Sequence, residues 1–158
     1  MRSTRSGEEL CSCSVRKAWF LESSTLAGQD VLNEPLTIKP NDDLTGIVVT
    51  LTNERAELTG TILNDLGEPA PEYFILVYST DEQYWTGPSR RLYGTRARPD
   101  GRYVISGLRG GSYRLATLLD VEFGAWFDPA FVRQLESASI PLTIADRDKK
   151  VLNLRVPK

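Results

Sequence analysis

Short segments in which apolar and polar residues alternate dominate the chain after residue 54. Residues 56–63 alternate with a period of two, which is typical of a half-buried β-strand. Residues 74–78 are instead continuously apolar, which predicts a central strand covered on both faces. The strands that these patterns predict are 56–63, 74–78, 92–98, 102–106, 113–119, 140–144 and 150–156.

Turn residues separate these segments. Asp100-Gly101 lies between 92–98 and 102–106, and it predicts a hairpin because glycine accepts a positive φ without steric cost. The glycine-rich segment 107–111 lets the chain fold back before the alternation resumes at Tyr113. Seven short strands with turns of this kind predict an all-β fold, a seven-stranded Greek-key sandwich.

A single short helix is expected between two of the strands, over residues 128–138. Asp128 is a suitable N-cap, and Pro129 suits the first helical position. Phe131, Leu135 and Ala138 then fall on one face, as in an amphipathic helix. We expect this helix to lie across one end of the sandwich.

Two parts of the chain resemble each other in order and spacing. The matching segments are 19–23 with 113–117, 35–38 with 141–144, and 46–51 with 151–156. This repeat predicts a tandem array of one module, of which the chain carries only the rear part of the first copy. The expected organisation is a disordered segment at 1–15, a partial β module at 16–53 and a complete sandwich at 54–158.

Composition narrows the possible chemistry. The 158 residues contain no histidine, which excludes Ser-His and Cys-His nucleophile pairs and the usual zinc sites. Cys11 and Cys13 are interpreted as unpaired thiols near a frayed terminus, with an intermolecular role as the alternative. We therefore expect no catalytic residue, no metal and no cofactor.

Charge and hydropathy argue against two classes of partner. The net charge is −2 and basic residues are spread along the chain, so we expect no nucleic-acid binding. No apolar run approaches the ~20 residues that span a bilayer, so we expect no membrane insertion. Residues 1–15 carry charge and serine without an apolar core, and no signal peptide is visible there.

Four motifs in order resemble the carboxypeptidase regulatory-like domain. They are Leu58-Thr59-Gly60-Thr61-Ile62, Asp65-x-Gly67-x-Pro69, Asp100-Gly101-x-Tyr103 and Gly107-Leu108-x-x-Gly111-x-Tyr113. The resemblance covers about residues 54–156 and implies a transthyretin-like (prealbumin-like) sandwich. It is closest to versions found in tandem on secreted or envelope proteins of bacteria. Here Arg109 and Gly110 replace the Pro-rich pair that the family usually has in this loop.

The connection at 81–91 holds the candidate contact residues. Tyr84 and Trp85 could form a flat platform for a sugar ring, with Asp81, Arg90 and Arg91 as hydrogen-bonding neighbours. The same side chains are favoured anchors of protein interfaces. The alternative is that Trp85 closes the end of the core while the two arginines pair with surface carboxylates.

Three acidic residues after the 113–119 strand invite a metal or catalytic interpretation. Asp120, Glu122 and Asp128 lack the spacing of a calcium loop, and we interpret them as solvated loop acids. Trp126 is expected to pack under the helix.

Two functions of different classes remain open. The resemblance implies a non-catalytic accessory module that mediates protein interaction or spacing in an extracytoplasmic bacterial protein, with protein partners or neighbouring modules. The alternative is a carbohydrate-binding module that contacts polysaccharide through the aromatic platform.

Overall fold

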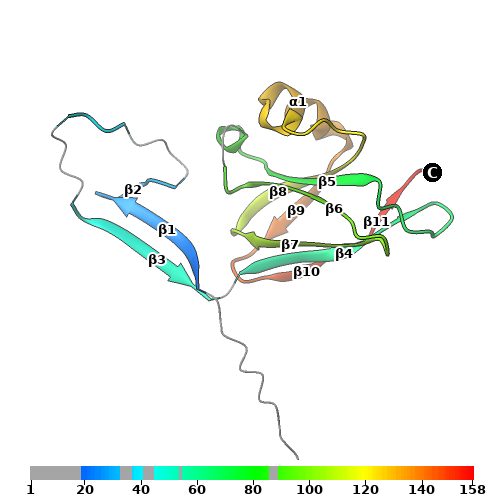
Figure 1. The fold of residues 1–158 in the computed structure, drawn as a ribbon, viewed down its shortest axis with the longest axis horizontal. Helices are drawn as coiled ribbons and strands as arrows, with labels where there is room; N and C mark the ends of the chain where they lie inside the picture. Colours follow the sequence, from blue (N-terminus) through cyan, green and yellow to red (C-terminus); the bar gives the residue numbers. More distant parts are fainter. Residues whose placement is uncertain (1–18, 33–36, 41–44, 54, 86–88) are drawn as a thin grey trace, which may run out of the picture.

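The computed structural model describes residues 19–32, 37–40, 45–53, 55–85 and 89–158, and about half of these form β-strands. Two four-stranded sheets face each other in a sandwich (Figure 1). The predicted all-β sandwich is confirmed. One sheet contains β4 (Ala56–Asn64), β7 (Arg102–Leu108), β10 (Lys149–Val151) and β11 (Leu154–Val156). The other has the order β6-β5-β8-β9, with β5 (Tyr73–Ser79), β6 (Leu92–Arg96), β8 (Gly111–Leu119) and β9 (Ile140–Ile144).

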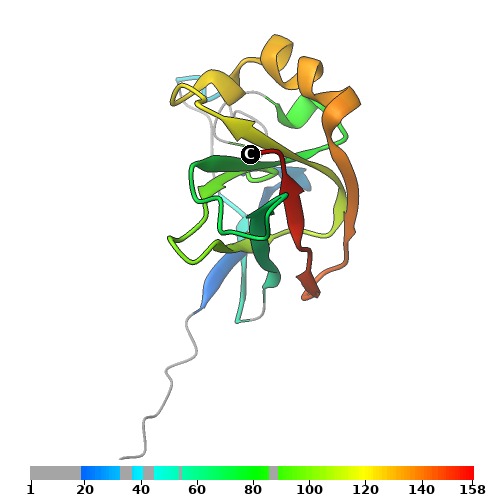
Figure 2. The same cartoon turned by 90° about the vertical axis from the view of Figure 1, so that its right-hand side faces the viewer.

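The strand β5 contributes to two separate cores, as its continuous apolar run predicts. Ile75 and Val77 point into the core between the two sheets, together with Leu58 and Tyr103. The alternate residues of β5 point the other way, into a second core beneath the helix α1 (Pro129–Leu135). Figures 1 and 2 show α1 on the outer side of the β5 sheet. This second core contains Phe74, Leu76, Tyr78, Trp85, Ala116, Trp126 and Val132.

The hairpin predicted between 92–98 and 102–106 is wrong in its pairing. The turn itself is present, because Gly101 N–H donates to the Arg98 carbonyl at 2.8 Å. However, β6 pairs with β5 in one sheet, and β7 pairs with β4 in the other. The turn therefore carries the chain from one sheet to the other, which lets β6 and β7 cover the inter-sheet core from opposite sides.

The last predicted strand is interrupted in its middle. β10 and β11 both run parallel to β4, and Leu152 and Asn153 separate them. There the Leu152 carbonyl approaches Gly60 so closely that a Cβ on Gly60 would lie 1.8 Å from its oxygen. The Asn153 side-chain oxygen accepts from the Thr61 N–H at 3.1 Å and replaces a ladder bond. Counted as one interrupted strand, β10 and β11 bring the sandwich to the seven expected strands.

The helical insert begins where the sequence predicts. Asp128 is the N-cap, and its carboxylate accepts from the Ala130 N–H at 2.8 Å. α1 ends at Leu135 and continues as the 3-10 helix η3 (Glu136–Ala138), which completes the predicted range 128–138. Two further 3-10 helices, η1 (Glu82–Tyr84) and η2 (Ala125–Phe127), lie in the loops after β5 and β8.

A separate three-stranded sheet precedes the sandwich. It has the order β2-β1-β3, with β1 (Phe20–Leu26), β2 (Gln29–Asp30) and β3 (Ile47–Thr52), and Figure 1 shows it apart from the sandwich. β3 forms one edge, and its apolar side chains are exposed on both faces of the sheet.

Two segments of the predicted repeat, 19–23 and 46–51, lie largely in strands, as their counterparts do, but their pairings are not equivalent. In the third segment, residues 37 and 38 are not in a strand, whereas 141–144 lies in β9. β1 pairs directly with β3, whereas their counterparts β8 and β10–β11 lie in opposite sheets of the sandwich. That residues 16–53 are the rear part of a preceding copy remains a prediction. The disordered segment predicted at 1–15, with its two cysteines, lies outside the described residues, as do 35 and 36.

Candidate binding cleft

The two aromatic residues of the predicted platform differ in burial, because Trp85 is buried and Tyr84 is partly exposed. Trp85 is completely buried in the core beneath α1, and its indole N–H donates to the Ser79 carbonyl at 2.7 Å. Its ring meets Tyr78 edge to face, with centroids 5.8 Å apart. Trp85 therefore packs in the core, as the second of the two interpretations of this residue expected. It offers no open face to a sugar.

The other residues of the predicted set lie nearer the surface. Asp81 caps η1, and its carboxylate accepts from the Gln83 N–H at 3.2 Å. The guanidinium carbon of Arg91 lies 4.8 Å from the centroid of the Tyr84 ring, which is a cation–π arrangement. The fold thus brings Tyr84 and Arg91 together and leaves Asp81 to a local capping role. Residues 86–88 of this connection lie outside the described residues.

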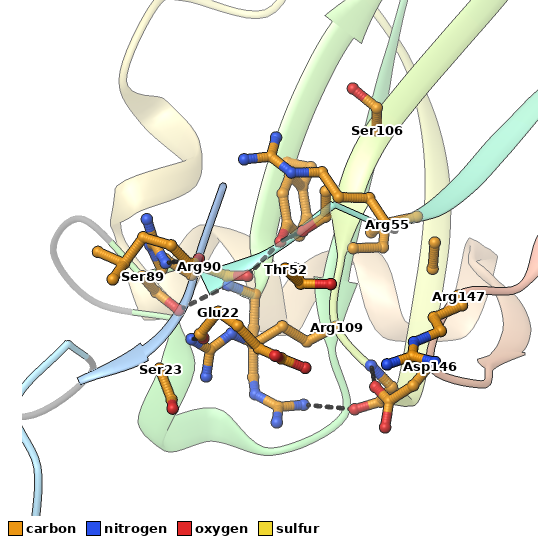
Figure 3. A pocket seen from close by; sticks show the side chains of 17 residues that line it. Glu22, Ser23, Thr52, Arg55, Ser89, Arg90, Ser106, Arg109, Asp146 and Arg147 are labelled. Carbon is orange, nitrogen blue, oxygen red and sulfur yellow. Dashed lines mark hydrogen bonds between the residues drawn. The ribbon is translucent and has the colours of Figure 1, made fainter. Parts of the chain in front are cut away.

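Arg90 and Arg91 line a cleft of about 620 Å³ that lies against β1 at one end of the sandwich (Figure 3). Five arginines and two carboxylates, those of Glu22 and Asp146, are among the residues that line it. The arginines are Arg55, Arg90, Arg91, Arg109 and Arg147. The cleft is therefore strongly basic, although the chain as a whole carries a net charge of −2.

Two of these arginines hold the backbone of β1. Arg90 Nη1 donates to the Leu21 carbonyl at 2.9 Å, and an amino group of Arg109 donates to the carbonyl of Glu22. Arg109 also lies 3.7 Å from the carboxylate of Asp30. We call this pair of arginine contacts the β1 clasp. The acceptors of the clasp are neutral main-chain carbonyls, and the carboxylate of Asp30 compensates part of the charge of Arg109.

Two tyrosines, the partly buried Tyr93 and the fully buried Tyr113, fix the loops that carry the clasp. The Tyr93 hydroxyl donates to the Gly107 carbonyl at 2.8 Å and also contacts the carbonyl of Arg90. The Tyr113 hydroxyl donates to the carbonyl of Arg109 at 2.8 Å. Burial raises the pKa of Tyr93 to about 12 and also raises the pKa of Tyr113. Both phenols therefore stay protonated and keep donating at neutral pH.

The glycine-rich loop packs tightly against the turn after β9. Gly110 N–H donates to Asp146 Oδ1 at 2.9 Å, while its carbonyl accepts from Arg91 Nη1 at 3.2 Å. A Cβ on Gly110 would lie 2.6 Å from Asp146 Oδ1, so this close approach requires glycine. The loop therefore links Arg91 to the acidic side of the cleft.

Arg55 completes the basic surface from the start of β4. Its guanidinium carbon lies 3.4 Å from the centroid of the Phe20 ring on β1. Burial, together with the positive charge of Arg90, lowers the pKa of Arg55. Burial is the larger of the two causes, and the contribution of Arg90 reflects a second positive charge near Arg55.

The sequence pointed to Arg90 and Arg91 but missed Arg55, Arg109 and Arg147. These three come from distant parts of the chain, and only the fold brings them together. One signal was available: Arg109 and Gly110 stand where the resembled family has a Pro-rich pair, and both take part in the cleft.

The acidic residues after β8 do not gather into a site. Within the described ranges, no group of three or more His, Cys, Asp or Glu side chains could hold a metal ion. Asp120 and Glu122 are exposed, and Asp128 caps α1. Trp126 stacks on Phe74 at 4.6 Å in the core beneath the helix, as predicted. The described residues also include no helix long and apolar enough to cross a bilayer.

Comparisons with known families and with curated proteins found no match. Among solved structures, a streptococcal ancillary pilin is 10% identical with a TM-score of 0.44, over 68% of this chain and 34% of that one. The minor pilin of Streptococcus agalactiae is 14% identical with a TM-score of 0.44, over 92% of this chain and 63% of that one. A putative carbohydrate-binding protein of Bacteroides uniformis is 14% identical with a TM-score of 0.37, over 64% of this chain and 40% of that one.

Dioxygenases also occur among these matches. The chain spans about a third of the length of the ancillary pilin. With TM-scores of 0.35 to 0.44 and identities of 9% to 14%, these likenesses carry no argument about activity or partner.

Proposed function

We propose that this chain is a non-catalytic β-sandwich module that mediates protein interaction or spacing within an extracytoplasmic bacterial protein. The observation that carries the proposal is the β1 clasp. Through Arg90 and Arg109, the sandwich donates hydrogen bonds to successive main-chain carbonyls, those of Leu21 and Glu22, on a strand outside itself. A guanidinium that donates to backbone carbonyls holds an extended chain largely regardless of its side chains. Such a contact suits a module that joins neighbouring segments of protein.

The resemblance to the carboxypeptidase regulatory-like domain supports the same role. That family supplies accessory modules, often in tandem, and the extracytoplasmic location is proposed from it. If residues 16–53 are the rear part of a preceding copy, the β1 clasp is the contact between successive modules. The junction would then set the spacing of the array.

A catalytic role has little chemical support. The whole sequence lacks histidine, so an imidazole general base is not available. The charged groups of the cleft are mainly guanidinium groups, which stay protonated and cannot accept a proton at neutral pH. The cleft is therefore suited to binding rather than to proton transfer.

The burial of Trp85 removes the main residue on which the carbohydrate-binding alternative depended. Trp85 is buried, and the guanidinium of Arg91 lies over the ring of Tyr84. An array of glycans tests this alternative directly. Binding that is abolished by Tyr84→Ala, with the fold retained by circular dichroism, would favour a sugar-binding module over the proposed one.

The β1 clasp can be tested by removing its donors. In the double variant Arg90→Ala/Arg109→Ala, we expect the three-stranded sheet to reorient freely, while the sandwich keeps its structure. Residual dipolar couplings would report this as separate alignment of β1 and of the sandwich strands. Arg98→Ala/Arg155→Ala, which removes the same charge from exposed positions, is the matched control. Unchanged relative alignment in the clasp variant would contradict the proposal.

A further inference from the structure

The basic cleft extends beyond the β1 clasp into a second cavity. This second cavity, of about 760 Å³, shares Arg55, Ser106 and Arg147 with the first. It adds Lys149 and one carboxylate, that of Glu57. The two cavities therefore adjoin each other. We call them together the groove, and its lining residues include six cationic and three acidic side chains.

Basic side chains enter this groove from several elements. Figure 3 shows Arg109 near Glu22 on one side and Arg147 beside Asp146 on the other, with Arg55 between the strands above. The hydrogen bonds of Arg90 and Arg109 go to neutral carbonyls, and Arg55 lies against an aromatic ring. Arg109 has Asp30 as a partly compensating carboxylate, at 3.7 Å. Since Arg90 is close enough to add to the effect of burial on the pKa of Arg55, an anion in the groove would reduce the repulsion between these two cations.

We propose that this groove binds an extended acidic peptide segment of a partner protein, with its carboxylates on Arg55, Arg147 and Lys149. The excess of cationic over acidic side chains matches carboxylate groups. The neighbouring clasp already holds a strand by its backbone, which suits an extended chain as the occupant. This inference rests on the proposed function and names the chemistry of the partner.

A peptide fits the groove better than an acidic polysaccharide. Sugar rings bind proteins largely by stacking on exposed aromatic faces. Phe20 and Tyr93 are the only aromatic residues in the described lining. Arg55 covers the ring of Phe20, and Tyr93 packs against the core between the sheets.

The test measures binding of labelled peptides to the full chain by fluorescence anisotropy. The probe is a short peptide in which glutamate and threonine alternate, so that its carboxylates lie on one face of an extended strand. The control probe carries glutamine in place of glutamate. We expect the glutamate peptide to bind and the glutamine peptide to bind at least about fivefold more weakly. Binding should also weaken as the ionic strength rises.

A double variant locates the binding site. In Arg147→Asn/Lys149→Gln we expect affinity for the glutamate peptide to fall about fivefold or more. Asparagine suits position 147 because the backbone there has a φ of 64°. The control Arg98→Gln/Arg155→Gln removes two exposed positive charges outside both cavities and should change affinity less than about twofold. Near-ultraviolet circular dichroism confirms that both variants remain folded.

Several results would overturn the inference. Equal affinity for the glutamate and glutamine peptides would remove the role of the carboxylates. Full affinity in Arg147→Asn/Lys149→Gln would place the peptide elsewhere. Tighter binding of oligogalacturonate than of the glutamate peptide would identify a polysaccharide site, and equal competition by inorganic phosphate would identify a site for small anions. None of these results depends on the β1 clasp, so the proposed function stands or falls separately.

Discussion

The close contact between Gly60 and Leu152 makes a strong prediction about stability. In Gly60→Ala, the new Cβ would lie 1.8 Å from the Leu152 oxygen and 3.0 Å from a ring carbon of Tyr103. Ordinary carbon–oxygen contacts are about 3.3 Å or longer, so the Leu152 carbonyl must move by roughly 1.5 Å. Gly60 and Leu152 are both partly buried, and Leu152 packs against the core between the sheets.

The expected cost follows from what holds Leu152 in place. Its N–H donates to the Thr59 carbonyl at 2.8 Å, and its carbonyl accepts from the Tyr103 hydroxyl at 2.6 Å. Losing both bonds costs about 2 kcal/mol, and overpacking adds about 1–3 kcal/mol. Alanine also reduces the conformational entropy of the unfolded chain, which offsets about 0.4–1 kcal/mol of this loss of stability. We therefore expect Gly60→Ala to lower the free energy of unfolding by about 2–4 kcal/mol.

Urea denaturation followed by tryptophan fluorescence measures this change, because Trp85 and Trp126 are buried in the folded chain. Tyr103→Phe removes only the hydroxyl and should cost about 1 kcal/mol. Gly67→Ala is the second comparison, because a Cβ there meets nothing within 4 Å and only the φ of +82° is unfavourable. If Gly60→Ala is no less stable than Gly67→Ala, the close contact with Leu152 does not constrain the sandwich.

Three further predictions concern the helix, the tyrosines and the amino-terminal sheet. Asp128→Ala removes the acceptor for the Ala130 N–H and should cost about 1 kcal/mol in urea denaturation, whereas Glu122→Ala should be neutral. Burial raises the pKa values of Tyr93 and Tyr103 to about 12, whereas an exposed phenol ionises near pH 10, so the thermal midpoint should fall between about pH 10 and pH 12. This fall should be smaller in Tyr103→Phe. The fragment 54–158 should unfold in a cooperative thermal transition and be more soluble than the full chain.

Each of these expectations has a result that contradicts it. Equal losses of stability in Asp128→Ala and Glu122→Ala would show that the Asp128 cap does not stabilise the helix. A thermal midpoint that stays constant above pH 10 would show that the tyrosines ionise equally in both states. A fragment without a cooperative transition would show that residues 16–53 complete the sandwich rather than precede it.

The sequence predicts the strands of the sandwich but not all of their partners. Alternation shows which face of a strand is buried, and the uninterrupted run at 74–78 correctly indicates burial on both faces. Pairing depends on contacts between distant segments, which local patterns do not contain. The Asp100-Gly101 turn therefore suggested a local hairpin, although β6 and β7 belong to different sheets.

The candidate site was predicted only where its residues are neighbours in sequence. Arg90 and Arg91 stood out as a pair, while Arg55, Arg109 and Arg147 are separated by long stretches of chain. Burial was predicted for Trp126, but for Trp85 the sequence left two interpretations open. A tryptophan serves as a ligand platform or as core, and the nearby carbonyl of Ser79 satisfies the indole of Trp85 inside the protein.

The chemistry of the junction explains why the amino-terminal sheet should be separable from the sandwich. The contacts that join them are mainly polar, through the β1 clasp and the loose ion pair between Arg109 and Asp30. The apolar side chains of β3 stay exposed, at 47% for Ile47 and 60% for Val48, instead of packing on the sandwich. Polar contacts at a surface contribute little net free energy, because water replaces them when they break. A junction of this kind orients two units without making either depend on the other for its core.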